Sequence, residues 1–217
     1  LPVLEGAAVR LRPIADADTD LIVKWRNTPS VVQNFIFRRT FTPEMHRSWL
    51  AAKVATGQVV QYIIIDKADA KPVGSVYYRD IDGHNRSAEY GIFIGEESAR
   101  GKGLGTETAK LFTDFGFAEL QLHRISLRVL AENTAARRSY EKAGFVQEGI
   151  FRDMELLDGQ YRDVVFMARL GDCKKSKSCS KSPPTRCFAC WGQLCSLRDF
   201  TSFAAEPPWM KFGCLPQ

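Results

Sequence analysis

Cysteine and long apolar runs are missing from most of this chain. No cysteine precedes Cys173 in the 217 residues, so disulfide bonds cannot stabilise the part before it. No apolar run approaches the roughly 20 residues that a membrane-spanning helix needs, and no signal-peptide pattern precedes the first expected strand. These absences predict a domain of the reducing cytoplasm with no membrane partner.

A strong excess of one charge is also missing from residues 1–170. This part contains 23 Lys/Arg and 22 Asp/Glu, a net charge of +1, whereas residues 171–217 contain 7 and 3, a net charge of +4. A nearly neutral domain lacks the basic surface that is typical of nucleic-acid binding, so we expect no nucleic-acid partner. With 45% hydrophobic and 25% charged residues, the composition is that of an ordinary globular protein.

The last 47 residues, 171–217, differ in character from the rest. All six cysteines lie there: Cys173, Cys179, Cys187, Cys190, Cys195 and Cys214. Only one pair, Cys187 and Cys190, has the short spacing of zinc ligands, and the tail contains no histidine. We therefore expect no metal and interpret this cysteine-rich tail as a disordered or non-native extension of a domain at 1–170. A zinc site that organises the tail is the alternative.

Hydrophobic periodicity in residues 1–170 predicts an α+β fold. Alternating or β-branched patterns predict strands at 7–13, 59–66, 72–81, 86–94 and 124–130, and on both sides of the turn at Asp158-Gly159. Helical patterns and caps predict helices ending at Asn27, running from Thr42 to Gly57, starting at Gly103, and lying between Asn133 and Gly144. This order predicts a mostly antiparallel mixed sheet of about six to seven strands with helices on both faces.

The stretch "ARGKGLGTETAKLF" places glycines at every second position before a helical pattern. It does not fit a Walker A loop, because Lys102 is followed by Gly103 rather than a hydroxyl residue. It does not fit a dinucleotide fingerprint either, whose third glycine would fall on Thr106. The spacing that fits is Arg-x-x-Gly-x-Gly, formed by Arg100, Gly103 and Gly105. Backbone N–H groups at a helix N-terminus bind anions; a glycine-rich turn with nothing bound is the alternative.

A second block, "NTAARRSYEKAGF", follows about one helix and one strand later. The two blocks together resemble the GCN5-related N-acetyltransferase (GNAT) superfamily, the first its acyl-CoA pyrophosphate loop and the second its Asn-x-x-Ala…Tyr-x-x-x-Gly-Phe helix. The matching residues of the second block are Asn133, Ala136, Tyr140, Gly144 and Phe145. The resemblance runs from about Val9 to about Leu170, and is to the group with ribosomal-protein N-terminal, spermidine and amino-sugar acetyltransferases.

This resemblance implies the fold of that superfamily, a GNAT-like sandwich, and acetyl-CoA as the cosubstrate. It implies an N-acetyltransferase, in which a primary amine attacks the thioester directly through a tetrahedral intermediate. The backbone of the strand before the loop would pair with the pantetheine arm and meet the oxyanion. The implied cofactor-binding residues are Ile92, Phe93, Ile94, Arg100, Gly101, Lys102, Gly103, Leu104, Gly105, Asn133, Ala136 and Tyr140.

Two side chains are candidates for proton transfer. Tyr140 matches the tyrosine that the resembling enzymes use as general acid for the departing thiolate; a tyrosine that only packs in the core is the alternative. Glu89 lies on the strand before the loop, on the side opposite Tyr90, and some relatives use a glutamate there as general base. A solvated edge carboxylate, with a water chain as the base, is the alternative for Glu89.

The acceptor is expected to bind near the N-terminal helices. The "WRN" triplet followed by "HRSW" is similar to enzymes that acetylate a 4-amino sugar on a nucleotide, and this favours a small metabolite or an amino sugar as acceptor. The candidate acceptor-binding residues are Arg26, Asn27, Phe37 and His46. The alternatives are a protein N-terminus as acceptor and a non-catalytic acyl-CoA-binding module; we expect a monomer or a homodimer.

Overall fold

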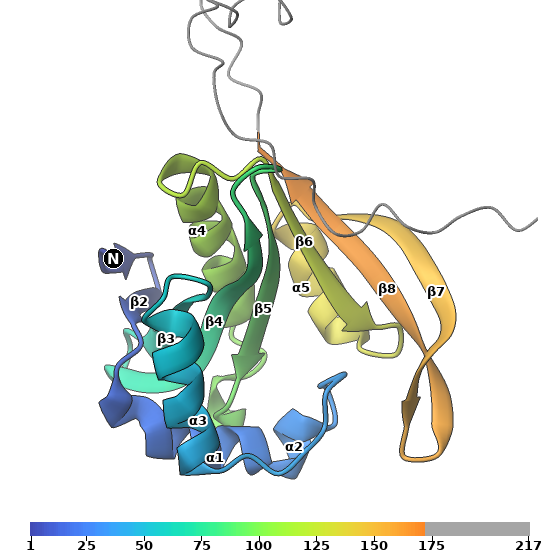
Figure 1. The fold of residues 1–217 in the computed structure, drawn as a ribbon, viewed down its shortest axis with the longest axis horizontal. Coiled ribbons are helices and arrows are strands. Elements are labelled where there is room, and N and C mark those ends of the chain that lie inside the picture. The colour runs from blue at the N-terminus through green and yellow to red at the C-terminus, as the bar shows by residue number, and fades with distance from the viewer. Residues whose placement is uncertain (172–217) are drawn as a thin grey trace, which may run out of the picture. The chain divides into compact units, whose positions relative to one another are not determined.

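The computed structural model describes residues 1–171, and the expectations for the cysteine-rich tail lie outside this range. One sheet of eight strands, in the order β1-β2-β3-β4-β5-β6-β8-β7, forms the centre of the domain (Figure 1). The strands are β1 (Leu4–Glu5), β2 (Val9–Pro13), β3 (Val60–Asp66), β4 (Lys71–Asp82), β5 (Ser87–Ile94), β6 (Arg124–Leu130), β7 (Val146–Leu157) and β8 (Gln160–Leu170). All neighbouring pairs are antiparallel except β5 and β6. The predicted fold class is confirmed; the expected strand count omitted the two-residue β1.

Helices cover the sheet and enclose separate apolar clusters. The α-helices are α1 (Thr19–Asn27), α2 (Pro29–Val32), α3 (Pro43–Trp49), α4 (Leu104–Ala118) and α5 (Thr134–Lys142), with short 3-10 turns at Asp16–Asp18 and Glu97–Ala99. The largest cluster joins α4 to Tyr62, Tyr78 and Tyr90 of the sheet. A second cluster joins Trp25 of α1 to Ile63 and Phe93. Because neighbouring strand residues point to opposite faces, Tyr62 and Ile63 place α4 and α1 on opposite sides.

The helix predicted from Thr42 to Gly57 changes character partway. Thr42 accepts a hydrogen bond from the Met45 N–H at 3.3 Å, which makes it the N-cap of α3, and Pro43 occupies the first helical position. The α-helix ends at Trp49 and continues as a π-helical turn, Leu50–Val54. No helix in the described part of the chain is long and apolar enough to cross a membrane.

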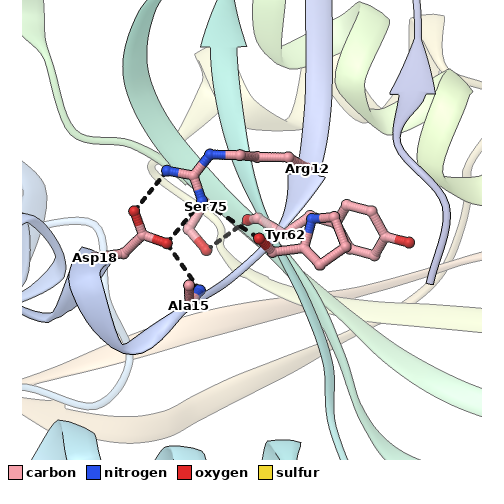
Figure 2. A network of polar contacts seen from close by, with 6 residues as sticks. Arg12, Ala15, Asp18, Tyr62 and Ser75 are labelled. Carbon is pink, nitrogen blue, oxygen red and sulfur yellow. Dashed lines mark hydrogen bonds and ion pairs between the residues drawn. The ribbon is translucent and has the colours of Figure 1, made fainter.

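An ion pair between a half-buried arginine and a buried aspartate attaches the start of α1 to the sheet (Figure 2). Arg12 of β2 donates two hydrogen bonds to the carboxylate of Asp18, at 2.8 and 2.6 Å, and Asp18 also accepts one from the Ala15 N–H at 2.9 Å. In the same network, the Ser75 hydroxyl donates to the Tyr62 carbonyl at 2.9 Å. A bidentate arginine–carboxylate pair fixes orientation as well as distance, so it sets where α1 lies over the sheet.

Candidate active site

The strands β5 and β6 separate after a short parallel pairing. Their register covers only Ser87–Glu89 against Arg124–Ser126, although β5 continues to Ile94 and β6 to Leu130. Figure 1 shows the two strands side by side at one end and apart at the other, with α5 behind the opening. Beyond Glu89, the edge of β5 that faces β6 therefore has backbone groups with no strand partner among residues 1–171, available to pair with an extended ligand.

The glycine loop follows directly on this edge and begins α4. Gly101 and Gly103 have left-handed backbones, with φ of +77° and +82°, and a Cβ at either position would meet nothing within 4 Å. Gly103 is the N-cap of α4, so the first N–H groups of a 15-residue helix emerge from an open loop. The Arg100 guanidinium reaches back to the Ile94 carbonyl and the Ser30 hydroxyl, both at 3.3 Å. The loop is thus held against the end of β5.

The other loop residues and the apolar residues at the end of β5 differ in how far their side chains are exposed. Lys102 is exposed and lies 4.0 Å from Asp66, and Leu104 is buried in the main core. On β5, Phe93 is buried whereas Ile92 and Ile94 pack partly buried against the main core. The side chains of these apolar residues pack in the apolar clusters, so at the strand edge they offer only backbone groups.

Tyr140 lies on α5, next to β5. The Tyr140 and Tyr90 rings meet edge-on with centroids 6.1 Å apart, and no hydrogen bond of the Tyr140 hydroxyl is formed within residues 1–171. Burial, and secondarily Tyr77, raises the pKa of Tyr140, so the phenol keeps its proton at neutral pH. The predicted boundaries of its helix are confirmed. Asn133 caps it by accepting from the Ala136 N–H at 3.1 Å, and Gly144, with φ of +93°, follows its end.

One hydrogen bond couples the glycine loop to the helix of Tyr140. The Thr106 hydroxyl in the first turn of α4 lies 2.8 Å from the hydroxyl of Ser139. Ser139 directly precedes Tyr140 in α5. Ser139 is also the nearest neighbour, at 3.8 Å, of a Cβ placed on Gly105. The spacing between the loop and Tyr140 is therefore set by contacts between two helices rather than by chain connectivity alone.

Tyr77 is a site residue that the sequence reasoning missed. On β4 it lies opposite Gly91 of β5, and a Cβ on Gly91 would lie only 2.5 Å from the Tyr77 hydroxyl. The Tyr77 ring therefore crosses over Gly91, in the part of β5 that has no pairing with β6, and Tyr77 contributes to the raised pKa of Tyr140. An isolated glycine inside a strand pattern signals a close approach of this kind, and Gly91 was that signal.

Glu89 is engaged by two arginines at the point where the strands separate. It accepts a hydrogen bond from Arg79 of β4 at 2.6 Å, and bonds from Arg128 of β6 at 3.2 and 3.4 Å. The carboxylate thus bridges the strands on either side of β5. Its side chain is only 20% exposed. Glu89 is therefore not the solvated edge carboxylate that the sequence left as an alternative, and its oxygens are not free of partners.

Arg26, an acceptor candidate from the sequence, lies in the last turn of α1. Its guanidinium carbon is 4.3 Å from the centre of the Phe35 ring and 5.1 Å from that of Phe41. Asn27, the next residue, exchanges two hydrogen bonds of 2.8 Å with the backbone of Phe41. Asn27 therefore holds the chain between α2 and α3 against the end of α1, and with it the aromatic surroundings of Arg26.

Phe37 and His46, the other two acceptor candidates, differ in exposure. Phe37 is 63% exposed, whereas His46 is 1% exposed and its Nδ1 lies 2.9 Å from the Thr19 hydroxyl. Burial lowers the pKa of His46. The structure therefore brings Arg26 and Asn27 together, leaves Phe37 on the outer side of its segment, and places His46 between helices.

The segment that carries Phe37 also reaches the far side of the sheet. Ile36 packs against Leu130, Leu157 and Val164, and Arg38 forms an ion pair with Asp158 at the turn between β7 and β8. The connection from α2 to α3 thus spans from the helices to the β7–β8 hairpin. Among residues 1–171, no group of three or more His, Cys, Asp or Glu side chains is placed to hold a metal ion.

Comparison with known proteins gives consistent matches. A family model described as an acetyltransferase (GNAT) domain matches residues 8–146. The chain is 32% identical over 160 residues to the spermidine N(1)-acetyltransferase of Escherichia coli K12, covering 74% of this chain and 84% of that protein. It is 30% identical over 176 residues to the probable N-acetyltransferase YjcK of Bacillus subtilis, covering 77% and 97%. A crystal structure of the Vibrio cholerae spermidine N-acetyltransferase with CoA and spermine superimposes with a TM-score of 0.71 at 26% identity, covering 76% of this chain and 96% of that one.

Proposed function

We propose that this chain, which belongs to the GNAT acetyltransferase family, acetylates the primary amine of a small metabolite. The chain is an N-acetyltransferase, and acetyl-CoA is its cosubstrate. The observation that supports acetyl transfer at this site is that three features lie together: the edge of β5 without a strand partner, the open glycine loop that follows it, and Tyr140 on α5, whose ring contacts Tyr90 of β5. Each answers one demand of acyl transfer from a thioester.

The glycine loop and the strand edge would hold the cosubstrate. The first N–H groups of α4, from Gly103 to Gly105, would bind the pyrophosphate, with Arg100 and Lys102 adding positive charge. The backbone of Ile92–Ile94 would pair with the pantetheine arm as an added strand. Asn133 and Ala136 would line the same side from α5. The open space at Gly101 and Gly103 supports this arrangement, because a side chain there would occupy it.

Tyr140 would complete the reaction. The amine nitrogen attacks the carbonyl carbon, the oxyanion accepts a hydrogen bond from a backbone N–H of β5, and the carbon–sulfur bond then breaks. The departing sulfur takes the proton of the Tyr140 phenol, which water later replaces. A phenol whose pKa is raised arrives at this step protonated.

We propose water as the acceptor of the amine proton, with Glu89 as the carboxylate that orders this water. Both oxygens of Glu89 already accept from arginines, so few of the carboxylate's acceptor sites remain open to an incoming amine N–H. Glu89→Gln separates the two roles. If Glu89 is the base itself, turnover falls about 10²–10⁴-fold, and the loss is smaller if it only orders water.

The test is a thiol-release assay of the full chain with acetyl-CoA and a panel of amines, which includes amino acids, amino sugars, polyamines and peptide N-termini. Thiol release that depends on the amine, with the acetylated product identified by mass spectrometry, is the expected result. Preferential turnover of peptides would replace the small-metabolite acceptor with a protein one. The cytoplasmic location and the monomeric or homodimeric state stay predictions, which fractionation and sedimentation would test.

A further inference from the structure

The guanidinium group of Arg26 is held by two aromatic rings and not by a carboxylate. Arg26 is half-buried between Phe35 and Phe41, at 4.3 and 5.1 Å from their ring centres. Asn27 fixes the backbone of Phe41 through two hydrogen bonds. Arginine stacks well on aromatic faces and leaves its N–H fork at the edge of the stack, so the orientation of this fork is set before any ligand binds.

No hydrogen bond or ion pair of the Arg26 side chain is formed within residues 1–171. The other half-buried arginines of the same sheet face do have carboxylates. Arg12 pairs with Asp18, and Arg79 and Arg128 pair with Glu89. Burial lowers the pKa of Arg26, Tyr77 raises it, and Arg39 and Arg79 lower it. A half-buried cation whose ionic neighbours are further cations is unfavourable unless an anion completes it.

Arg26 lies beside the place where the acceptor amine must arrive. Phe35, stacked under Arg26, meets Phe93 of β5 with ring centroids 5.6 Å apart. Two residues earlier on the same face of β5 is Gly91, with the Tyr77 hydroxyl over it. Arg26 and Tyr77 are near enough for Tyr77 to affect the pKa of Arg26. The unpartnered cation is thus adjacent to the unpaired edge of β5.

We propose that Arg26 binds a carboxylate or phosphate group of the acceptor, so that the enzyme acetylates anionic amines and discriminates against polyamines. A guanidinium fork recognises both groups through two parallel N–H···O bonds. A polycation such as spermidine would instead meet Arg26, Arg39 and Arg79, and the nearby Glu89 is already occupied by two arginines. This substrate class rests on the proposed function, and it differs from the acceptor named for the spermidine acetyltransferases.

The experiment compares amines matched in skeleton. The pairs are 4-aminobutyrate with butylamine, for the carboxylate, and phosphoethanolamine with ethanolamine, for the phosphate; spermidine is the polycation. Turnover is measured by thiol release, and binding to the CoA-loaded full chain is measured separately by calorimetry. The member of at least one pair that carries the carboxylate or phosphate should have a kcat/KM about 10- to 100-fold higher than the partner without it, the scale of a charged hydrogen-bonded contact, and spermidine should be the poorest substrate.

Arg26→Met keeps an unbranched apolar stem between the two rings and removes the charge. It should abolish the preference for the anionic member while acetyl-CoA affinity stays unchanged. Arg47→Met is the matched control, because Arg47 is an exposed arginine of α3 paired with Asp16 at 3.7 Å, and it should leave the preference intact. A purely structural role of Arg26 would lower both members of a pair equally.

The outcomes separate this inference from the proposed function. Equal or better use of spermidine or of the amines without an anionic group by the wild-type chain, or an unchanged preference in Arg26→Met, overturns the anion site and leaves acetyl transfer standing. Binding of an anionic amine that Arg26→Met abolishes, without any turnover, supports the anion site and counts against the proposed transfer. Neither binding nor turnover of any anionic member overturns the inference.

Discussion

The proposed cosubstrate side and the proposed acceptor side of the candidate site differ in whether backbone or side chains form them. The cosubstrate side consists of backbone: the unpaired edge of β5, two left-handed glycines and the N-terminus of α4. The acceptor side consists of side chains from distant segments, Arg26 on α1, Tyr77 on β4 and Glu89 on β5 among them. A site formed by backbone groups requires a local sequence pattern, which can be recognised in the sequence. A site formed by side chains from distant segments requires only that the fold brings them together.

Tyr140→Phe is expected to have the largest effect, because it removes the hydroxyl group proposed to protonate the departing thiolate. Turnover should fall about 10²–10⁴-fold, the usual range for a positioned acid, with acetyl-CoA affinity and melting temperature unchanged. The loss should appear in kcat rather than KM. Steady-state kinetics with calorimetry measure this. Near-normal turnover would make Tyr140 a packing residue.

Gly103→Ala tests whether the cosubstrate side works through its backbone. The left-handed φ of +82° should cost about 1–2 kcal/mol of stability for any residue with a Cβ, and the Cβ would enter the space proposed for the pyrophosphate. We expect acetyl-CoA affinity to fall about 10-fold or more, as for loss of a charged hydrogen bond. Gly57→Ala is the control, since Gly57 has φ of +74° and an equally open surrounding. It should lose similar stability and no affinity, and equal affinity losses would refute the assignment of the loop.

Gly91→Ala tests the contact between the two sides. The new Cβ would overlap the Tyr77 hydroxyl, so the ring must move, and overpacking of this kind costs about 1–3 kcal/mol. Denaturant unfolding should show this loss, and turnover should fall because Tyr77 leaves the edge of β5. Gly83→Ala, in the turn before β5 with nothing within 4 Å, should change stability by no more than about 0.5 kcal/mol. Stability of Gly91→Ala equal to that of Gly83→Ala would mean that Tyr77 does not need the glycine.

The smallest expected effect is a pH dependence of the free energy of unfolding that is due to His46 of α3. Burial, the largest cause, lowers its pKa from 6.5, Asp16 and Asp18 oppose this, and Arg47 adds to it. The unfolded chain therefore binds the proton at a higher pH than the folded chain. The stabilisation is complete above pH 6.5 and is lost as pH falls through the lowered value. The slope is at most about 1.4 kcal/mol per pH unit. Urea titrations at several pH values measure the free energy of unfolding. Below pH 6.5, this free energy should change less steeply with pH in His46→Gln than in the wild-type chain, and equal slopes would contradict the prediction.

Much of the fold was predictable because its signals are local. Alternating apolar residues gave the long strands, and the Asn133 cap and the Gly144 stop bounded the helix of Tyr140 correctly. The two-residue β1 was missed, since two residues carry no periodicity. The helix from Thr42 was predicted to Gly57, but the π-helical turn at Leu50–Val54 interrupts it. The Ala55 N–H bonds the Leu50 carbonyl five residues earlier, and a helical sequence pattern does not distinguish this spacing from the α-helical one.

The sequence by itself determined the glycine loop, the helix of Tyr140 and the family, because each depends on backbone conformations that a few neighbouring residues impose. Only the tertiary structure decided that Tyr77 crosses over Gly91, that Arg79 and Arg128 engage Glu89, and that Arg26 has no carboxylate beside it within residues 1–171. Whether a charge is paired depends on which distant side chains reach it once the strands have their register. The chemistry of the proposed acceptor site therefore depends on the distances between side chains of α1, β4, β5 and β6.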